Sequence, residues 1–586
     1  MASRPLQALA VALSLASEAL AQSVNETVWS SFSYILYGER TPLQGQLSPS
    51  LTPIGAQQLY SQGSLMRARY LSNSSLSDEV NTITTNSPIS GIERQALDNS
   101  QIAILSTSDD YVVGGALAYL QGLYPPVTQN FAYNNGGVNA STLANGTSVD
   151  YPLDGYQYPN VQTVSLTDPN SAWLEGQTLC TEYWTSYNDF RNSDIAQRMH
   201  NSTTTFYETT WREVFPNTLA NSMLNFDYAY DLYDYAQYAY DHDESVRNAL
   251  GPDRLSLLRS LAGNQQFDLN GNLSASGSQE GDMIRAISGR MLAGKVVTQL
   301  SQHISSGGTA NKMTLMFGSF EPFIAFFALS DLYNEASIFQ EIPQPGAAMV
   351  FELFSTNNDS SYPRQDELWV RFLYRNGTAS DEPLTEYPLF GRGNSETRMQ
   401  YVDFIAAMDN FSVRDISGWC NVCSSLSLYC SALSDSTGDS GSSNVNSDNS
   451  NGNSSLSPAI AGVIGAITTI AVLGLLGTTA FVFGGLRIRY KDTPESSRRH
   501  SSLGGFKGAE KMTPDRDVSI AKNGVRHERV GSWELGGPGG IRAPPPAATG
   551  GSADGPFGAS IMHRRGDDGD NDSIAGLVPV KPAEQV

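Results

Sequence analysis

Four cysteines are the residues whose types and spacing most directly suggest chemistry in this chain. Cys420, Cys423 and Cys430 form a cluster that contains a C-x-x-C pair, and Cys180 lies far upstream. A C-x-x-C pair with a further cysteine can hold zinc, but an even number of cysteines favours disulfides wherever a chain is secreted. We therefore predict two disulfides, one of which joins Cys180 to the cluster. The sequence leaves open which cysteine of the cluster it meets.

Histidines outside the C-terminal region are few, which leaves little material for a His-rich metal site. His242 stands in the acidic run DHDE after a polar helical stretch, so we predict a solvated helix end there rather than a catalytic His-Asp pair. His200 and His303 are predicted to lie at the surface. Nothing in the sequence implies a metal ion or another cofactor.

The N-terminal residues predict entry into the secretory pathway. Residues 1–21 place an apolar run behind a single basic residue, Arg4, and end in the A-x-A pattern Ala19-Leu20-Ala21. This combination is typical of a cleaved signal peptide.

A second apolar stretch predicts a membrane anchor. Residues 459–486 carry no charged side chain. At about 1.5 Å of rise per residue, a helix of this length crosses the roughly 30 Å hydrocarbon core of a bilayer. Arg487, Arg489 and Lys491 follow directly, so the positive-inside rule places the C-terminus in the cytoplasm. We expect a single-pass type I protein of the plasma membrane or a secretory-pathway membrane.

The remaining segments divide by composition. Residues 22–431 have the composition of a globular ectodomain, extracellular or lumenal. Residues 432–458 are a stalk rich in Ser and Asn, and residues 487–586 are predicted to be a disordered cytoplasmic tail.

Charge and glycosylation motifs agree with this layout. The net charge is −23, and it resides almost entirely before the apolar stretch, which excludes nucleic acid as a partner because that requires a basic surface. N-x-S/T sequons predict a glycosylated ectodomain. The candidate asparagines are Asn25, Asn73, Asn139, Asn145, Asn201, Asn272, Asn358, Asn376, Asn410 and Asn453.

Strand-like and helical patterns alternate within the ectodomain. This favours an α/β fold with a mostly parallel sheet flanked by helices, and the helical middle, at about residues 125–300, suggests an inserted helical subdomain. The sequence predicts strands at residues 32–36 and 314–317, and helices at residues 50–71, 111–123, 225–240, 283–304 and 323–332.

Five segments, in order and at suitable spacing, resemble a known family. Residues 34–42, YILYGERTP, resemble the R-H-G-x-R-x-P segment of the histidine acid phosphatases, branch two of the histidine phosphatase (phosphoglycerate-mutase-like) superfamily. Residues 51–55, LTPIG, and 67–71, RARYL, resemble its L-T-x-x-G and R-x-R-Y segments. Residues 116–123, ALAYLQGL, resemble its S-A-x-A-F-x-x-G-L helix, and residues 315–321, LMFGSFE, fall where the family has H-D or H-A-E.

The resemblance covers about residues 28–431 and implies the family's fold and its hydrolysis of phosphate monoesters. In that chemistry a histidine attacks phosphorus, arginines and a second histidine hold the phosphate, and a carboxylic acid protonates the leaving oxygen. This chain keeps Arg40, and it keeps Glu321 at the acid position. It departs from the family at the nucleophile, two arginine positions and the second histidine, which are Tyr37, Leu36, Tyr111 and Ser319.

These departures predict a pseudophosphatase that binds a small phosphorylated ligand or a protein partner. Each charge-assisted hydrogen bond lost costs about 1.5–3 kcal/mol of phosphate affinity, and a phenol with a pKa near 10 is a poor nucleophile. One alternative is an active acid phosphatase with a remodelled site, in which Tyr37 and Glu321 are catalytic and Arg40 clamps phosphate. Another is a cell-surface receptor or adhesion protein.

Overall fold

The computed structural model describes residues 26–45, 48–72, 76–356 and 361–437. The predicted signal peptide, the apolar span, the cytoplasmic tail and nearly all of the stalk lie outside these residues, so those assignments stay predictions. Within the described ranges, no helix has the length and apolar character needed to cross a bilayer.

A central sheet forms the core of the protein, in the order β3-β2-β4-β1-β5-β6-β7, with β8 also paired to β6. Every residue of β1 after the first is buried, as are all residues of β4 and β5, so this layer is covered on both faces. The strands are β1 (Thr27–Leu36), β2 (Ile102–Thr107), β3 (Gln162–Val164), β4 (Met313–Gly318), β5 (Ala348–Ser355), β6 (Leu368–Arg375), β7 (Thr385–Tyr387) and β8 (Arg398–Gln400).

The mostly parallel sheet predicted from the sequence is wrong for half of the sheet. β3, β2, β4 and β1 are paired in parallel, whereas β5 is antiparallel to β1, and β6, β7 and β8 continue with antiparallel pairing. The reversal begins with the pairing of β5 against β1, which joins distant parts of the chain and has no local sequence signature. Alternating strands and helices predict parallel pairing only where a helix connects neighbouring strands, and no described α-helix lies between β5 and β6.

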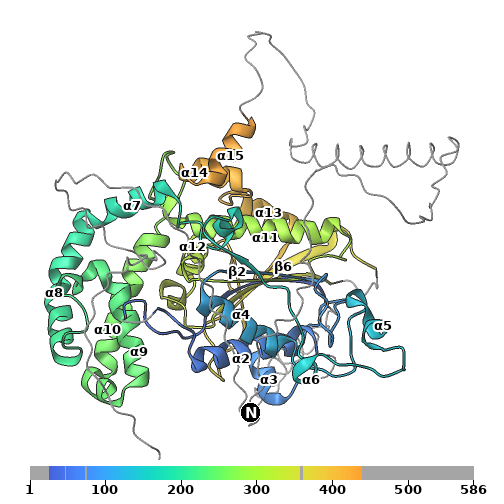
Figure 1. Ribbon diagram of the computed structural model, residues 1–586. Coiled ribbons are helices and arrows are strands. Elements are labelled where there is room, and N and C mark those ends of the chain that lie inside the picture. The colour runs from blue at the N-terminus through green and yellow to red at the C-terminus, as the bar shows by residue number, and fades with distance from the viewer. Residues whose placement is uncertain (1–25, 46–47, 73–75, 357–360, 438–586) are drawn as a thin grey trace, which may run out of the picture. The chain divides into compact units, whose positions relative to one another are not determined.

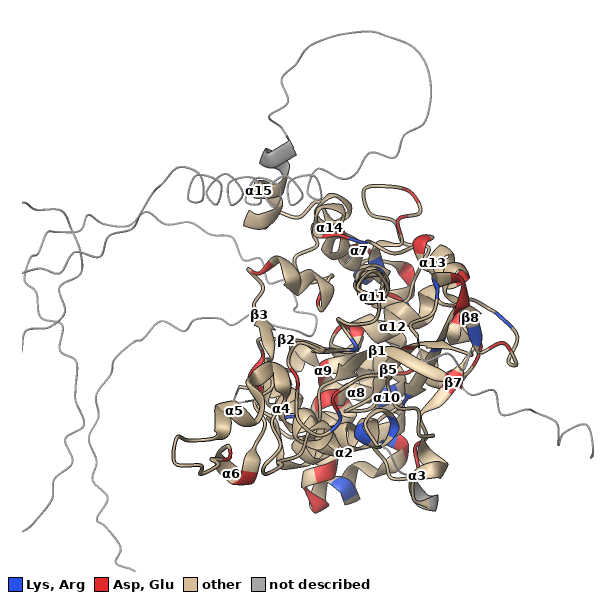
Figure 2. Ribbon diagram, turned by 90° about the vertical axis from the view of Figure 1, so that its right-hand side faces the viewer, with Lys and Arg blue, Asp and Glu red and all other residues tan. Residues whose placement is uncertain are grey.

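Helices cover both faces of the sheet. α2 and α4 pack against each other on one face, and α11, α12 and α13 lie on the other (Figures 1 and 2). The helices are α2 (Pro53–Tyr70), α3 (Asp78–Ile83), α4 (Asp110–Leu123), α5 (Gly137–Ser141), α6 (Pro152–Gly155), α7 (Thr181–Arg191), α8 (Asp194–Val214), α9 (Ala229–His242), α10 (Glu244–Asn270), α11 (Ile287–Ser305), α12 (Glu321–Leu329), α13 (Tyr401–Asp409), α14 (Ile416–Cys423) and α15 (Leu428–Thr437).

The inserted helical subdomain is smaller than the predicted range of 125–300. α7, α8, α9 and α10 form a helical unit at one side of the sheet, on the left in Figure 1, and they span residues 181–270. Residues 125–180 are mainly loops that add the edge strand β3, and α11 is a covering helix that contacts β1.

The loop after β1 is held against α2 by local chemistry that the sequence anticipates. Thr52 caps α2 by accepting a hydrogen bond from the backbone N–H of Gly55 at 3.0 Å, and Pro53 occupies the first turn. A Cβ on Gly38 would lie 2.3 Å from the carbonyl oxygen of Gly55, so only glycine lets the loop approach this closely.

The RARYL segment has a structural role. Glu352 on β5 is fully buried and is bound by Arg69 of α2 and by Arg371 of β6. Burial raises the pKa of Glu352, but the two guanidinium groups outweigh it and lower that pKa to about 2. Tyr70 also donates to this carboxylate. The segment therefore fixes α2 to the sheet and does not reach the phosphatase-like site.

Candidate functional site

The parallel strands bring the predicted site residues to one edge of the sheet. β1, β4 and β2 end at Leu36, Gly318 and Thr107, and their carboxyl ends lie side by side. Tyr37 and Arg40 follow β1, while Ser319 and Glu321 follow β4. Tyr111 lies in the first turn of α4, just after β2. Ligand sites of α/β sheets form at this edge.

Arg40 packs against two aromatic rings that also contact each other. Its guanidinium carbon lies 5.1 Å from the centre of the Tyr37 ring and 5.4 Å from the centre of the Tyr111 ring. The two rings meet edge to face, with centres 5.2 Å apart. Arg40 is only 5% exposed. Tyr37 and Tyr111, which the resemblance places at the nucleophile and at an arginine position, therefore both pack against Arg40.

Two residues of α9 complete this cluster, and neither was predicted from the sequence. Nη1 of Arg40 forms an ion pair with Asp234 Oδ2 at 3.0 Å. Nη2 donates to the hydroxyls of Tyr37 and Tyr230, each at 3.4 Å, and these hydroxyls are hydrogen-bonded to each other at 3.0 Å. Tyr230 and Asp234 are four positions apart and so share one helix face. This spacing was the only sequence pattern that could have linked them. Their contact with Arg40 spans about half the ectodomain and has no local signature.

The phenol of Tyr37 is held in its neutral form. Burial raises the pKa of Tyr37, and the positive charge of Arg40 opposes this without cancelling it. No histidine or carboxylate hydrogen-bonds to this hydroxyl among the described residues; its partners are Tyr230 and Arg40. None of the described residues therefore contacts this hydroxyl as a base that would activate the phenol as a nucleophile.

Glu321 lies at the start of α12 and is 4% exposed. The hydroxyl of Ser319 donates to its Oε2. Burial raises the pKa of Glu321 to about 7, although the Ser319 hydrogen bond and Arg40 act in the opposite direction. Glu175 is a second buried carboxyl nearby, and burial, then Asp109 and Glu321, raise its pKa to about 8.

A cavity of about 160 Å³ adjoins the cluster. Tyr37 and Arg40 form part of its wall, together with residues of α9, whereas Tyr111, Ser319 and Glu321 are not among the lining residues. The structure therefore brings the five predicted side chains together, but only Tyr37 and Arg40 line the cavity. The other three lie outside its wall. Among the lining side chains, the carboxylates of Glu39, Asp234 and Asp241 face a single cationic group, that of Arg40.

The histidines lie outside this cavity. His242 is at the end of α9, as predicted, but its Nε2 lies 3.0 Å from Oε1 of Glu39, and its ring stacks on Tyr238. His200 is half-buried on α8. The predicted surface position of His303 is wrong, because this side chain is fully buried, and burial lowers its pKa to about 4. Its polar Ser/Gly-rich neighbours suggested exposure, yet the ring packs against Tyr362.

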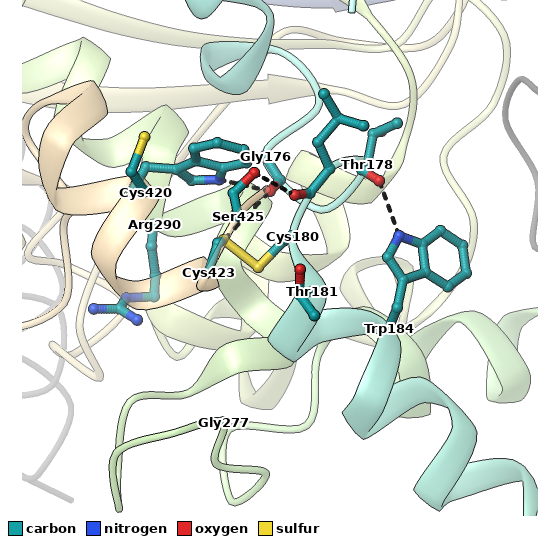
Figure 3. The surroundings of a disulfide bond; sticks show 12 residues. Gly176, Thr178, Cys180, Thr181, Trp184, Gly277, Arg290, Cys420, Cys423 and Ser425 are labelled. Carbon is teal, nitrogen blue, oxygen red and sulfur yellow. Dashed lines mark hydrogen bonds between the residues drawn. A yellow bond between two sulfur atoms is a disulfide. The ribbon is translucent and has the colours of Figure 1, made fainter. Parts of the chain in front are cut away.

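All four cysteines form disulfides, as predicted, and the open connectivity is resolved. Cys180 pairs with Cys423, and Cys420 pairs with Cys430. Figure 3 shows the first bond between the start of α7 and the end of α14. Beside it, Trp184 donates to the carbonyl of Thr178 at 2.9 Å, and Ser425 donates to that of Leu179 at 2.8 Å (Figure 3). The bond therefore fixes the helical unit to the C-terminal helices.

The glycosylation candidates have mixed exposure, and their modification stays a prediction. Asn272 and Asn376 are half-buried. Asn25, Asn73, Asn358 and Asn453 lie outside the described residues. The exposed candidates are Asn139, Asn145, Asn201 and Asn410.

Solved structures with a similar backbone fold include two phytases and an inositol polyphosphate phosphatase, all of low sequence identity to this chain. The phytase from Citrobacter braakii is 13% identical over 67% of this chain and 99% of its own, with a TM-score of 0.43. The Klebsiella sp. ASR1 phytase is 10% identical over 67% and 97%, with a TM-score of 0.42. A multiple inositol polyphosphate phosphatase from Bifidobacterium longum is 12% identical over 66% and 93%, with a TM-score of 0.38.

No curated protein matches the sequence of this chain. The family model of the histidine phosphatase superfamily (branch 2) matches residues 24–375, which is more than half of the chain. The matched range contains β1, β2 and β4 with the loops that carry Tyr37, Arg40, Tyr111, Ser319 and Glu321. The chain therefore belongs to the histidine phosphatase superfamily, branch 2.

Proposed function

We propose that this chain is a pseudophosphatase, which keeps the phosphatase fold, has lost phosphohistidine chemistry and binds a ligand or a protein partner. The observation that carries the proposal is that the guanidinium of Arg40 is already bound by Asp234 and by two tyrosine hydroxyls. With it we propose the topology that the sequence predicts: a signal peptide, a glycosylated ectodomain and a single-pass type I anchor in the plasma membrane or a secretory-pathway membrane.

Arg40 has little hydrogen-bonding capacity left for a substrate. Its two terminal nitrogens donate to Asp234, the Thr41 carbonyl and two tyrosine hydroxyls. Only Nε lacks an acceptor among the described residues, and it is buried from solvent. A phosphate would have to displace Asp234, whose own charge would then oppose the dianion. Charge-assisted hydrogen bonds are worth about 1.5–3 kcal/mol each, so this exchange disfavours phosphate.

The missing nucleophile supports the same proposal. Phosphohistidine chemistry needs an imidazole at the position of Tyr37, and the Tyr37 phenol is neutral and hydrogen-bonded to Tyr230. Leu36, at a former arginine position, has no donor group in its side chain. The three described histidines lie elsewhere, and the nearest to the loop, His242, is bound to Glu39.

An assay of the full-length chain tests the proposal. We expect no hydrolysis of an aryl phosphate between pH 4 and 8 above that of the heat-denatured chain. The matched variant is Tyr37→Phe, which removes only the hydroxyl. Turnover by the native chain that disappears in Tyr37→Phe would refute the proposal.

One observation favours a second candidate, an active acid phosphatase with a remodelled site. A general acid must be protonated at the working pH, and with a pKa of about 7 Glu321 is protonated in mild acid. This candidate requires turnover near pH 5 that is lost in Glu321→Gln. Turnover at pH 5 retained by Glu321→Gln would exclude it.

A further inference from the structure

We infer that the cavity beside Arg40 accepts a small organic cation, such as an ammonium head group, in place of a phosphate dianion. The inference rests on the proposed function, because it requires that phosphate no longer occupies this site.

Aromatic rings supply much of the cavity wall. Tyr37, Tyr230, Tyr233, Tyr238 and Phe320 all line it. The face of an aromatic ring carries partial negative charge and attracts ammonium groups. The ring of Tyr37 already faces Arg40, and one face of Tyr238 stacks on His242, whereas no described arginine or lysine lies over the ring of Tyr233.

The carboxylates of the cavity retain free acceptor positions. Asp234 receives both of its hydrogen bonds at Oδ2, from Arg40 and from the backbone of Leu43. Glu39 receives both of its hydrogen bonds at Oε1, from Thr52 and His242. Oδ1 of Asp234 and Oε2 of Glu39 therefore accept no hydrogen bond from any described residue. These oxygens are suited to the N–H or polarised C–H groups of an ammonium ion.

The charge balance of the lining also favours a cation. Arg40 is paired with Asp234, and Glu39 lies 3.0 Å from His242, so the lining carboxylates exceed the one lining arginine by two, Glu39 and Asp241. Arg247 lies 3.9 Å from Asp241 in an exposed pair, which water screens. Acidic positions also mark α9 in the view coloured by charge (Figure 2). The net charge of −23 would further raise the local concentration of cations.

The size of the cavity limits the ligand. About 160 Å³ is below the roughly 300–1,000 Å³ typical of pockets for drug-sized molecules. It suits a single head group, with the rest of the ligand outside.

Isothermal titration calorimetry of the full-length chain tests the inference, with tetramethylammonium chloride as the probe and sodium chloride at matched ionic strength as the blank. We expect saturable binding of tetramethylammonium, and none of inorganic phosphate. Tyr238→Leu, which removes a half-buried ring, should weaken binding about two- to five-fold, the range of a cation–π contact at a partly exposed site.

A charge-matched pair of variants separates the cavity from the overall charge. Asp241→Asn should weaken binding of tetramethylammonium several-fold, whereas Asp253→Asn removes the same charge from an exposed position on α10 that does not line the cavity and should not. Equal affinities in these two variants, or no binding by the native chain, would overturn the inference.

An aryl phosphate assay on the same preparation distinguishes this failure from failure of the proposed function. Absence of both turnover and ammonium binding would overturn the cation inference alone. Turnover that requires the Tyr37 hydroxyl would overturn the proposed function, and the cation inference with it.

Discussion

Nη1 of Arg40 lies 3.0 Å from Oδ2 of Asp234, and this ion pair joins the loop after β1 to the helical unit. The exposed fractions of the two side chains are 2% and 16%, so the pair is largely shielded from water. The backbone N–H of Leu43 donates to the same carboxylate oxygen at 2.8 Å. α9 thus supplies the anion that pairs with Arg40.

Replacing Asp234 with Asn should release Arg40 and destabilise the fold. Removing one partner of a shielded ion pair leaves an uncompensated charge, which costs about 3–5 kcal/mol when fully buried and less here because Asp234 is partly exposed. We expect a lower melting temperature for Asp234→Asn, and partial recovery of that temperature with added inorganic phosphate. The exposed variant Asp253→Asn is the control. A melting temperature equal to that of the native chain would show that the ion pair contributes nothing.

The hydroxyl of Tyr230 should contribute measurably to stability. It bonds to Tyr37 and Arg40 in a buried setting, and a buried hydrogen bond is worth about 1 kcal/mol. Tyr230→Phe should therefore lower the free energy of unfolding by about 1–2 kcal/mol in urea denaturation. Tyr238→Phe is matched to it, because the Tyr238 hydroxyl has no hydrogen-bond partner among the described residues. The prediction fails if both variants unfold at the same urea concentration.

Stability should decrease as the pH rises from mildly acidic to neutral. The pKa values of Glu175 and Glu321 rise from 4.5 to about 8 and about 7, so the folded protein keeps protons that the unfolded chain releases above pH 4.5. The resulting cost grows through this window and is complete above about pH 8, and each unit of pKa shift corresponds to about 1.4 kcal/mol. Thermal melts should give a higher melting temperature at pH 5 than at pH 8.

A neutral variant checks the origin of this pH dependence. Glu175→Gln removes one of the two titrating groups and should make the profile less steep, whereas Glu280→Gln, at an exposed loop position, should leave it unchanged. Glu352 acts in the opposite direction at lower pH. Its pKa falls from 4.5 to about 2, so its stabilising contribution is present above pH 4.5 and is lost as the pH falls toward 2. A profile that rises from pH 5 to pH 8 would contradict the prediction.

The two disulfides should differ in their contribution to stability. Cys180 and Cys423 are 243 residues apart, whereas Cys420 and Cys430 are 10 apart. Chain-entropy estimates give about 5 kcal/mol for the longer loop and about 3 kcal/mol for the shorter. The double variant C180S/C423S should therefore unfold at a lower urea concentration than C420S/C430S. The reverse order would show that native-state packing, and not loop closure, dominates.

Local sequence patterns were sufficient to predict the helices and strands that carry the family motifs. The Thr52 cap and Pro53 predicted the start of α2, and α4, α11, β1 and β4 also lie where the sequence placed them. These elements are long, periodic or bounded by capping residues, so their type is encoded nearby in the chain.

The features that were missed depend on contacts between distant residues. The antiparallel half of the sheet depends on the pairing of β5 with β1, across more than 300 residues. The contact of Asp234 with Arg40 likewise joins segments 194 residues apart. At the site, the resemblance to the family identified positions that converge, but not the α9 side chains of Tyr230 and Asp234 that contact Arg40.

The Cys180–Cys423 bond has a consequence for any protease that cuts this protein. A single cleavage at any peptide bond between these two cysteines, including the linker between α10 and α11, would leave both fragments covalently attached. On a gel without reductant the nicked and intact forms would migrate as one species of the same mass. Processing of the ectodomain in this interval would become visible only after a thiol is added.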